Sequence, residues 1–357
     1  MTVAVGMSGG VDSTVTAWLL KRQGHDVVGL TMQIWDGSIA IPDEGRSGCY
    51  GPGEARDLEF ARDEAERLGI RHVTISLADA YNRCVLDPFR ADYRAGRTPN
   101  PCVVCNQRMK FGLLLDEARQ QGITFDRFAT GHYARTTLDP ARGVYRLLRG
   151  VDASKDQSYF LSRLTQEQLR QVWFPLGGMV KKEVVSLALE AGFADVAARE
   201  ESQDFIESES YAPLFNESDN RSGPIVDTTG RVLGTHRGIV HYTVGQRQGI
   251  GIATGERLYV KELQPERNTV VMGTREEVFS PGCRVEDVNW ISGSPPPPGT
   301  TCRTLLRYHH PGVQAQLDPL PDGAWQAQFA EPQFAVAPGQ AAVFYDGEEV
   351  LGGGWIA

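Results

Sequence analysis

The residues best suited to chemistry lie in a glycine-rich segment near the start of the chain, residues 6–13, which reads GMSGGVDS. Its glycines let the backbone approach an anion closely and adopt positive φ. A helix that begins here would direct its free N–H groups at a phosphate, and Ser8 and Ser13 can add hydroxyl donors. The Asp12 carboxylate would repel a phosphate, so we expect it to hold Mg²⁺ or to cap the helix.

This segment differs from two familiar nucleotide-binding patterns, because it contains neither GK[ST] nor GxGxxG. It matches SGGxDS instead and so resembles the pyrophosphatase-type P-loop enzymes. The resemblance implies cleavage of ATP to AMP and pyrophosphate, with an oxygen adenylated to make it a leaving group. By itself it leaves GMP synthetase, NAD synthetase, argininosuccinate synthetase and tRNA-modifying enzymes open.

A second group of reactive residues is a CxxC pair, Cys102 and Cys105, in a polar and proline-rich stretch. This spacing suits metal, cluster or redox chemistry. The other four cysteines are Cys49, Cys84, Cys283 and Cys302. A structural disulfide framework is not expected, because we place the chain in the reducing cytoplasm. We expect Cys84, Cys283 and Cys302 to pack as small apolar groups.

Alternating strand-like and helix-like segments must position these residues. Strands are predicted at residues 2–5, 26–32, 72–77 and 128–130, and helices at residues 12–22 and 54–68. Such alternation predicts an α/β fold, a doubly wound parallel sheet with helices on both faces. The phosphate loop would then lie between the first strand and the first helix.

The character of the sequence changes twice, which predicts three domains. Residues 1–205 carry the alternating pattern and form the catalytic domain. Residues 206–272 are rich in Gly, Ser and Thr, with short β-like stretches, and predict a small, mostly-β central domain that links its neighbours. Residues 273–357 include a loop of four prolines and short alternating runs, which predict a C-terminal β-barrel.

Composition narrows the class of protein. The 357 residues are 41% hydrophobic, which suffices for ordinary globular cores, and they carry a net charge of −9. The acidic total excludes a generally basic surface, but a local patch of Lys and Arg can still bind RNA. No stretch approaches the ~18 apolar residues of a membrane helix, and the N-terminus lacks signal-peptide features. We therefore expect a cytoplasmic protein without a membrane partner.

Further motifs follow one another in a specific order. They are residues 98–106 (TPNPCVVCN), 129–133 (ATGHY), 155–160 (KDQSYF), 201–204 (ESQD), 242–249 (YTVGQRQG), 338–340 (PGQ) and 351–354 (LGGG). In this order they resemble the tRNA-specific 2-thiouridylases, the MnmA family, over nearly the whole chain. The resemblance implies that ATP adenylates the 2-oxygen of the wobble uridine, position 34, in the tRNAs for Lys, Glu and Gln, and that sulfur then replaces it.

The same resemblance assigns roles to individual residues. The ATP-binding residues would be Gly6, Met7, Ser8, Gly9, Gly10, Val11, Asp12, Ser13, Met32 and Gly131. Those in contact with tRNA would be Asn100, Pro101 and Cys102, near the target base, and Lys155, Asp156, Gln157, Arg307 and Tyr308. Cys105 matches the catalytic cysteine, and His132 and Gln340 match further positions of interest. Lys155 and Arg307 suit phosphates, and Tyr308 offers an aromatic face or a hydroxyl.

The sequence departs from the family at its cysteines. Better-known members carry a second cysteine, the persulfide carrier, just after the SQD motif. Here Asp204 is followed by Phe205 and Ile206, and no cysteine occurs from residue 106 to residue 282. Cys102, in turn, stands at a position that is Asp in those members, which creates the CxxC pair.

Two mechanisms could compensate for the missing cysteine. We favour a [4Fe–4S] cluster held by Cys102, Cys105 and Cys49, with one iron left open for hydrosulfide, because related tRNA thiolases use three cysteines this way. Alternatively, Cys102 and Cys105 form a persulfide pair, in which one cysteine carries the sulfur and the other releases it by forming a disulfide. Zinc at the same cysteines would lack a fourth ligand.

Other functions remain open. The chain could be a tRNA-binding protein or sulfur carrier that has lost catalysis, although its intact phosphate loop and the CxxC pair argue against this. It could also be a ligase for a small molecule, which its C-terminal domains argue against. The cofactors expected are ATP, Mg²⁺ and the cluster. The partners are tRNA and a sulfur donor, either a cysteine desulfurase or relay protein, or hydrosulfide.

Overall fold

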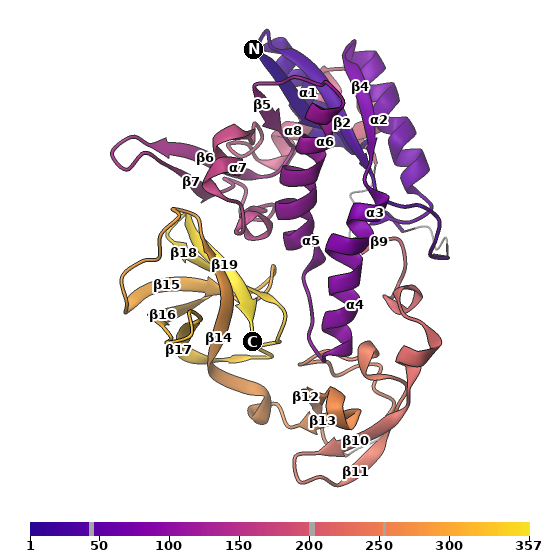
Figure 1. The fold of residues 1–357 in the computed structure, drawn as a ribbon, viewed down its shortest axis with the longest axis vertical. Coiled ribbons are helices and arrows are strands. Elements are labelled where there is room, and N and C mark those ends of the chain that lie inside the picture. Colours follow the sequence, from indigo (N-terminus) through magenta and orange to yellow (C-terminus); the bar gives the residue numbers. More distant parts are fainter. Residues whose placement is uncertain (43–45, 200–203, 253–254) are drawn as a thin grey trace.

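A five-stranded parallel sheet forms the centre of the N-terminal domain (Figure 1). The computed structural model describes residues 1–42, 46–199, 204–252 and 255–357. The strand order is β4-β2-β1-β5-β8, and the strands are β1 (Thr2–Gly6), β2 (Asp26–Gln33), β4 (Arg71–Ser76), β5 (Arg127–Ala129) and β8 (Val172–Trp173). β1 lies inside the sheet, with β2 on one side and β5 on the other, so the strand order changes direction there. The carboxyl end of β1 is therefore a switch point, the place where α/β sheets bind ligands.

Helices cover both faces of this sheet. Since side chains alternate along a strand, Val3 and Val5 pack on one face and Ala4 on the other. The first face is covered by α1 (Val11–Arg22), α2 (Glu54–Leu68), α8 (Lys181–Glu190) and α9 (Ala194–Ala197). The predicted doubly wound α/β fold is confirmed.

The second face is covered by helical segments that also extend away from the sheet toward the other domains (Figure 1). They are α3 (Ala78–Tyr81), α4 (Asp87–Arg94), α5 (Pro101–Val104) and α6 (Leu114–Gln120), with π-helical segments η1 (Asn82–Leu86) and η2 (Cys105–Leu113) and, later in the chain, α7 (Gln166–Gln171). Short 3₁₀ segments are η3 (Ser158–Leu161), η4 (Ala212–Leu214), η5 (Glu217–Asn220), η6 (Ile239–His241), η7 (Pro265–Arg267) and η8 (Glu276–Val278). Within the described ranges, no helix is long and apolar enough to cross a membrane.

Two short strands connect distant parts of the N-terminal domain. β3 (Gly48–Tyr50) pairs in parallel with β9 (Asp204–Ile206), with Gly48 opposite Asp204 and Tyr50 opposite Ile206. Glu207, the residue after β9, accepts a hydrogen bond of 2.7 Å from the backbone N–H of Gly53, just before α2. The chain around Cys49 is thus attached to the end of the domain.

The two remaining domains are built of strands. The central sheet has the order β11-β10-β13-β12, from β10 (Gly223–Asp227), β11 (Val232–His236), β12 (Tyr259–Gln264) and β13 (Thr269–Gly273). The C-terminal barrel has the order β14-β17-β16-β15-β18-β19 and closes by pairing β14 with β19. Its strands are β14 (Phe279–Trp290), β15 (Thr300–Leu305), β16 (Val313–Pro319), β17 (Trp325–Phe334), β18 (Ala341–Asp346) and β19 (Glu349–Ile356). The predicted barrel is confirmed, and Cys283 and Cys302 are buried in it.

The barrel sheet includes a hairpin from the N-terminal domain. β6 (Ala134–Asp139) and β7 (Val144–Arg149) pair with each other, and β7 pairs with β19 through Leu148 and Glu349. Arg146 adds an ion pair of 2.6 Å to Glu349. This hairpin follows directly after the ATGHY motif, so the site and the barrel are linked by a few residues.

Candidate active site

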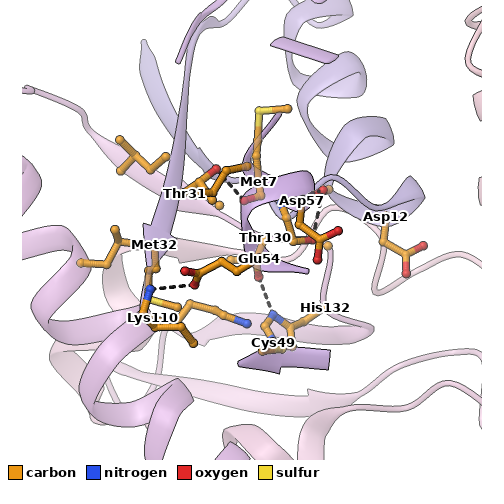
Figure 2. Close-up of a pocket in the computed structure, with 18 of the residues that line it drawn as sticks. Met7, Asp12, Thr31, Met32, Cys49, Glu54, Asp57, Lys110, Thr130 and His132 are labelled. Atoms are coloured by element: carbon orange, nitrogen blue, oxygen red, sulfur yellow. Dashed lines mark hydrogen bonds between the residues drawn. The ribbon is translucent and has the colours of Figure 1, made fainter. Parts of the chain in front are cut away.

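A cavity of about 260 Å³ opens at the carboxyl ends of β1 and β2 (Figure 2). Seven of the residues predicted to bind ATP line it: Gly6, Met7, Ser8, Asp12, Ser13, Met32 and Gly131. The other three, Gly9, Gly10 and Val11, lie between them in the loop. Cys49, Lys110, His132 and Gln157 line the same cavity, so the phosphate loop and a thiol share one space.

The phosphate loop has the backbone geometry that its glycines predict. Gly9 has a φ of +72°, and a Cβ there would lie 2.9 Å from the carbonyl oxygen of Asp57. Ser13 Oγ donates to the carbonyl of Gly10 at 2.9 Å and accepts from the N–H of Ser8 at 3.3 Å. These bonds fix the turn and leave the first N–H groups of α1 at the cavity, where they can bind an anion.

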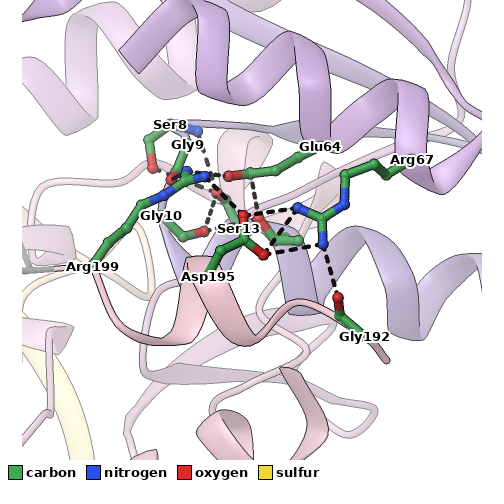
Figure 3. A network of polar contacts seen from close by, with 10 residues as sticks. Ser8, Gly9, Gly10, Ser13, Glu64, Arg67, Gly192, Asp195 and Arg199 are labelled. Atoms are coloured by element: carbon green, nitrogen blue, oxygen red, sulfur yellow. Dashed lines mark hydrogen bonds and ion pairs between the residues drawn. The ribbon is translucent and has the colours of Figure 1, made fainter. Parts of the chain in front are cut away.

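A network behind the loop holds it in place (Figure 3). Arg199 Nη1 donates to the carbonyl of Gly9 at 2.6 Å and pairs with the buried Glu64 carboxylate at 2.5 Å. The Arg199 guanidinium also stacks 3.8 Å above the Phe60 ring, and Glu64 accepts a hydrogen bond from Thr14 on α1. Because Arg199 holds the Gly9 carbonyl, that oxygen is turned away from the phosphate site. Nothing in the sequence indicated this contact.

Asp12 has two partners on one oxygen. Its Oδ1 accepts a hydrogen bond of 2.9 Å from the Tyr133 hydroxyl and an ion pair of 2.7 Å from Lys181 Nζ. A Cβ on Gly131 would lie 2.8 Å from Asp12 carbon atoms, which explains why a glycine stands there. Lys181 was missed in the sequence, because it belongs to no motif and lies 169 residues away.

Three more polar side chains line the cavity: Glu54, Lys110 and His132 (Figure 2). Glu54 accepts from the N–H groups of Ile34 at 2.7 Å and Trp35 at 3.0 Å, and burial raises its pKa to about 7. Burial, with the charge of Lys110, lowers the pKa of His132 well below its ordinary value. His132 is therefore neutral at pH 7, and its Nδ1 shares a hydrogen bond of 2.7 Å with Thr130 Oγ1.

The three cysteines expected to handle sulfur lie near one another. Cys49 is reached through the cavity, and Cys102 and Cys105 are half-buried. Cys49 is exposed, whereas burial raises the pKa of Cys102 and of Cys105, to about 11 for Cys105, and Lys110 opposes the shift in both. Cys49 raises the pKa of both other thiols, and all three raise that of the Tyr81 hydroxyl. Cys102 and Cys105 are therefore protonated at neutral pH.

Cys49 also lies beside the segment where better-known relatives carry their second cysteine. Residues 201–203 of the ESQD motif are outside the described residues, but Asp204 begins β9, and Cys49 is on the paired strand β3. Among the described residues, no three His, Cys, Asp or Glu side chains are arranged to hold a metal ion.

The residues predicted to contact tRNA fall into two groups. Asn100 caps α5 by accepting from the N–H of Val103 at 3.2 Å, and with Pro101 it lines a second cavity of about 570 Å³ beside the barrel. Arg307 is exposed and Lys155 is half-buried, and Tyr308 packs on Phe160 with ring centroids 4.4 Å apart.

Two other predicted tRNA contacts make bonds within the protein. Asp156 is buried and accepts from Arg149 Nε at 2.6 Å and from the N–H groups of Gly150 and Ser158 at 3.0 and 3.1 Å. Gln157 accepts from the Tyr133 N–H at 3.1 Å. These bonds set the shape of the loop that presents Lys155.

Gln340 connects the barrel to the CxxC loop. Its Nε2 donates to the carbonyl of Thr98 at 3.1 Å, and the Thr98 N–H donates to the carbonyl of Pro338 at 2.7 Å. Gly339 has a φ of +87°, and a Cβ there would lie 2.9 Å from the backbone nitrogen of Thr98. The PGQ motif therefore fixes the segment that leads into Asn100 and Cys102.

Comparison with known proteins identifies relatives over the whole chain. Residues 1–207 match the family model described as "tRNA methyl transferase HUP domain", residues 214–274 "tRNA methyl transferase PRC-barrel domain" and residues 280–356 "Aminomethyltransferase beta-barrel domain". The chain is 46% identical to a tRNA-specific 2-thiouridylase MnmA of Geotalea uraniireducens, covering 99% of this chain and 94% of that protein. It is 46% identical to the protein of that name from Geobacter metallireducens, covering 99% and 96%, and 43% identical to that from Nostoc punctiforme, covering 99% and 98%.

Proposed function

The chain belongs to the tRNA-specific 2-thiouridylase (MnmA) family and is a tRNA-uridine 2-sulfurtransferase, and from this premise we propose that it thiolates the wobble uridine, position 34, in two steps driven by ATP. The observation that carries the proposal is the single cavity, because the phosphate loop and Cys49 line the same space. An activated uridine formed at the loop would need to move little before it meets sulfur.

The first step is adenylation of the uridine 2-oxygen. The oxygen attacks the α-phosphorus of ATP, the bond from that phosphorus to the bridging oxygen breaks, and pyrophosphate leaves with the electron pair. The N3 proton of uracil passes to a base or to solvent. The α1 N–H groups and the hydroxyls of Ser8 and Ser13 would bind the phosphates. Asp12 fits Mg²⁺, since this ion takes one or two protein carboxylates and completes its shell with phosphates and water.

The second step replaces the adenylated oxygen with sulfur. A sulfur nucleophile attacks C2 of the activated base, the C2–O bond breaks, and AMP leaves. The neutral His132 and the Lys110 ammonium line this part of the cavity. Lys110 also favours the thiolate form of the neighbouring cysteines, and it is the thiolate that acts as a nucleophile or a metal ligand.

For the sulfur source, we favour a [4Fe–4S] cluster held by Cys49, Cys102 and Cys105. Three thiols are the kind of donor that binds such clusters, but in the described part of the chain they are not arranged to hold a metal ion, so cluster binding would require them to move together. When bound, the cluster would supply an iron that can hold hydrosulfide. Cys49, on the strand beside the segment that normally carries the second cysteine, would complete the set. The protein's contribution is the Lys110 charge, which offsets the charge of the thiolates.

The alternative is a persulfide on the Cys102 and Cys105 pair. A donor protein with a persulfide transfers one sulfur to a cysteine, and the terminal sulfur attacks C2. The second thiolate then attacks the inner sulfur, which forms a disulfide and releases the thiolated base. A thiol reductant must reduce this disulfide before the next turnover.

Iron and acid-labile sulfide, measured in protein purified without oxygen, separate these two sources. About four of each per chain, lost in Cys49→Ala, Cys102→Ala and Cys105→Ala but kept in Cys84→Ala, would support the cluster. Cys84 is a matched control because it is a half-buried cysteine of the neighbouring segment η1. Negligible iron after reconstitution would favour the persulfide pair.

ATP turnover with and without tRNA tests the function itself. AMP and pyrophosphate formed only with the tRNAs for Lys, Glu or Gln, together with thiolated uridine, would support the proposal. No turnover under any condition would favour a non-catalytic tRNA-binding or sulfur-carrier protein, and turnover with a small-molecule acceptor would favour a ligase. We expect the reaction to take place in the cytoplasm, with a cysteine desulfurase, a relay protein or hydrosulfide as the sulfur donor.

A further inference from the structure

Lys181 lies beside the phosphate loop, although no motif contains it. Its Nζ is 2.7 Å from Asp12 Oδ1, the oxygen that also accepts the Tyr133 hydroxyl. The ammonium lies 5.9 Å from the centre of the Tyr133 ring. The Lys181 side chain is 16% exposed and that of Asp12, which lines the cavity, is 30% exposed, so the pair is partly shielded from water.

The backbone of Lys181 is fixed where this contact requires. Lys181 is the first residue of α8, and its N–H donates to Asp152 Oδ2 at 2.9 Å. Val184 and Ala188 of the same helix are buried in the core that α8 shares with α1. The backbone of Lys181 is thus held by α8 and by Asp152, and its side chain extends from there to Asp12.

The loop needs a positive charge that its own sequence does not provide. It lacks the lysine of the GK[ST] pattern, and ATP brings several negative charges. Arg199 contacts the loop from behind but is committed to the Glu64 carboxylate and the Gly9 carbonyl. Lys110 lies on the cysteine side of the cavity. Lys181 contacts Asp12, which lines the cavity beside the phosphate loop.

We propose that Lys181 is a phosphate-binding residue that changes partner during the reaction. Without nucleotide it neutralises Asp12. When ATP and Mg²⁺ bind, the Asp12 carboxylate would hold the metal ion, and the Lys181 ammonium would turn to the β-phosphate. This inference rests on the proposed use of ATP and adds a residue and a sequence of contacts to it.

The exchange also explains the two partners of Asp12. Without Lys181, the partly buried Asp12 carboxylate would keep the Tyr133 hydroxyl but would lack this countercharge, which is costly. Lys181 removes that cost until the metal ion arrives. As the bond to the α-phosphorus breaks, the electron pair moves onto pyrophosphate, and the ammonium then stabilises the added negative charge.

Equilibrium binding without tRNA tests the phosphate contact. We expect Lys181→Met to weaken ATP and pyrophosphate binding about tenfold or more, as for loss of a charged hydrogen bond, and to leave AMP binding unchanged. Lys182→Met is the matched control, because Lys182 is the next residue on α8 and is exposed; it should bind all three as the parent does. Equal weakening of ATP and AMP, or no change, would overturn the proposal.

Binding of Mn²⁺ without nucleotide, followed by water proton relaxation, tests the exchange. Because Lys181 and the metal ion compete for Asp12, Lys181→Met should bind Mn²⁺ more tightly while it binds ATP more weakly. A structural role for Lys181 cannot produce these opposite shifts, and unchanged or weaker Mn²⁺ binding would refute the exchange.

If Lys181→Met does not fold, Lys181→Gln gives the same readouts. Parent protein that binds ATP but never thiolates tRNA would contradict the proposed function and leave this inference standing.

Discussion

Glu54 is a carboxyl group in an environment that favours its protonated form. Burial raises its pKa from 4.5 to about 7, although two backbone N–H donors oppose the shift. In the unfolded chain the group ionises near 4.5. Between these two values the folded state therefore binds the extra proton, so the stability contributed by Glu54 is present at low pH and is lost as pH rises toward 7.

Chemical denaturation of Glu54→Gln and the parent, at a series of pH values, checks this prediction. The full shift corresponds to about 3 kcal/mol, which we reduce to about 2 kcal/mol because the cavity admits water. The free energy of unfolding of the parent should fall by this amount, relative to the variant, between about pH 4.5 and 7. Parallel curves for the two proteins would show that Glu54 does not hold the proton.

At this scale, the sequence predicts residues that are neighbours along the chain and misses those that are neighbours only in space. Residues 6–13 could be recognised because one turn contains both the glycines and the hydroxyls. Lys181 and Arg199 could not, since each reaches the loop from a segment at least 169 residues away. An ordinary lysine at the start of a helix gives no signal of its own.

Close approach between elements makes Gly131 a sensitive position. A Cβ there would lie 2.8 Å from the Asp12 backbone and side chain, so Gly131→Ala must displace the start of α1. Overpacking of this kind costs about 1–3 kcal/mol. We expect a lower melting temperature and about tenfold weaker ATP binding. Gly178→Ala is the control, because nothing lies within 4 Å of a Cβ at Gly178; an equal loss in the control would contradict the prediction.

The elements themselves were predicted where their pattern is strong. The strand and helix around the phosphate loop show clear apolar periodicity, whereas β3 and β9 have three residues each, too few to show any. The pairing of β3 with β9 positions Cys49, and no sequence pattern indicates this contact.

Across the whole molecule, an acidic protein must bind a polyanion. With a net charge of −9, affinity for tRNA has to come from local groups such as Lys155 and Arg307. We expect Lys155→Ala and Arg307→Ala each to weaken tRNA binding and to reduce the slope of log K against log salt by about 0.7 to 1.

Titration of tRNA binding at several salt concentrations checks this expectation. Arg71→Ala is the control, because Arg71 is exposed at the start of β4. The cavity lies at the other, carboxyl ends of the strands. If the slope of log K against log salt falls as much in the control as in the two variants, tRNA binding does not depend on Lys155 and Arg307.

The order of the domains was predictable because composition and periodicity change along the chain. What was not predictable is how the domains are joined. The hairpin β6–β7 belongs by sequence to the first domain and by hydrogen bonding to the barrel sheet, and Gln340 of the barrel holds Thr98 of the CxxC loop. Such contacts depend on tertiary packing and leave no mark on local sequence.

The shared sheet has a consequence for how substrates are selected. Because β7 is bonded to β19 and the hairpin starts at the cavity wall, the barrel is tied to the N-terminal domain, and we expect this link to restrain the span from Arg307 to the phosphate loop. The RNA must therefore supply the deformation. An anticodon loop would be accepted according to the energy that it takes to turn its wobble base outward across that span, so loop stiffness, as well as base identity, would decide which tRNAs are modified.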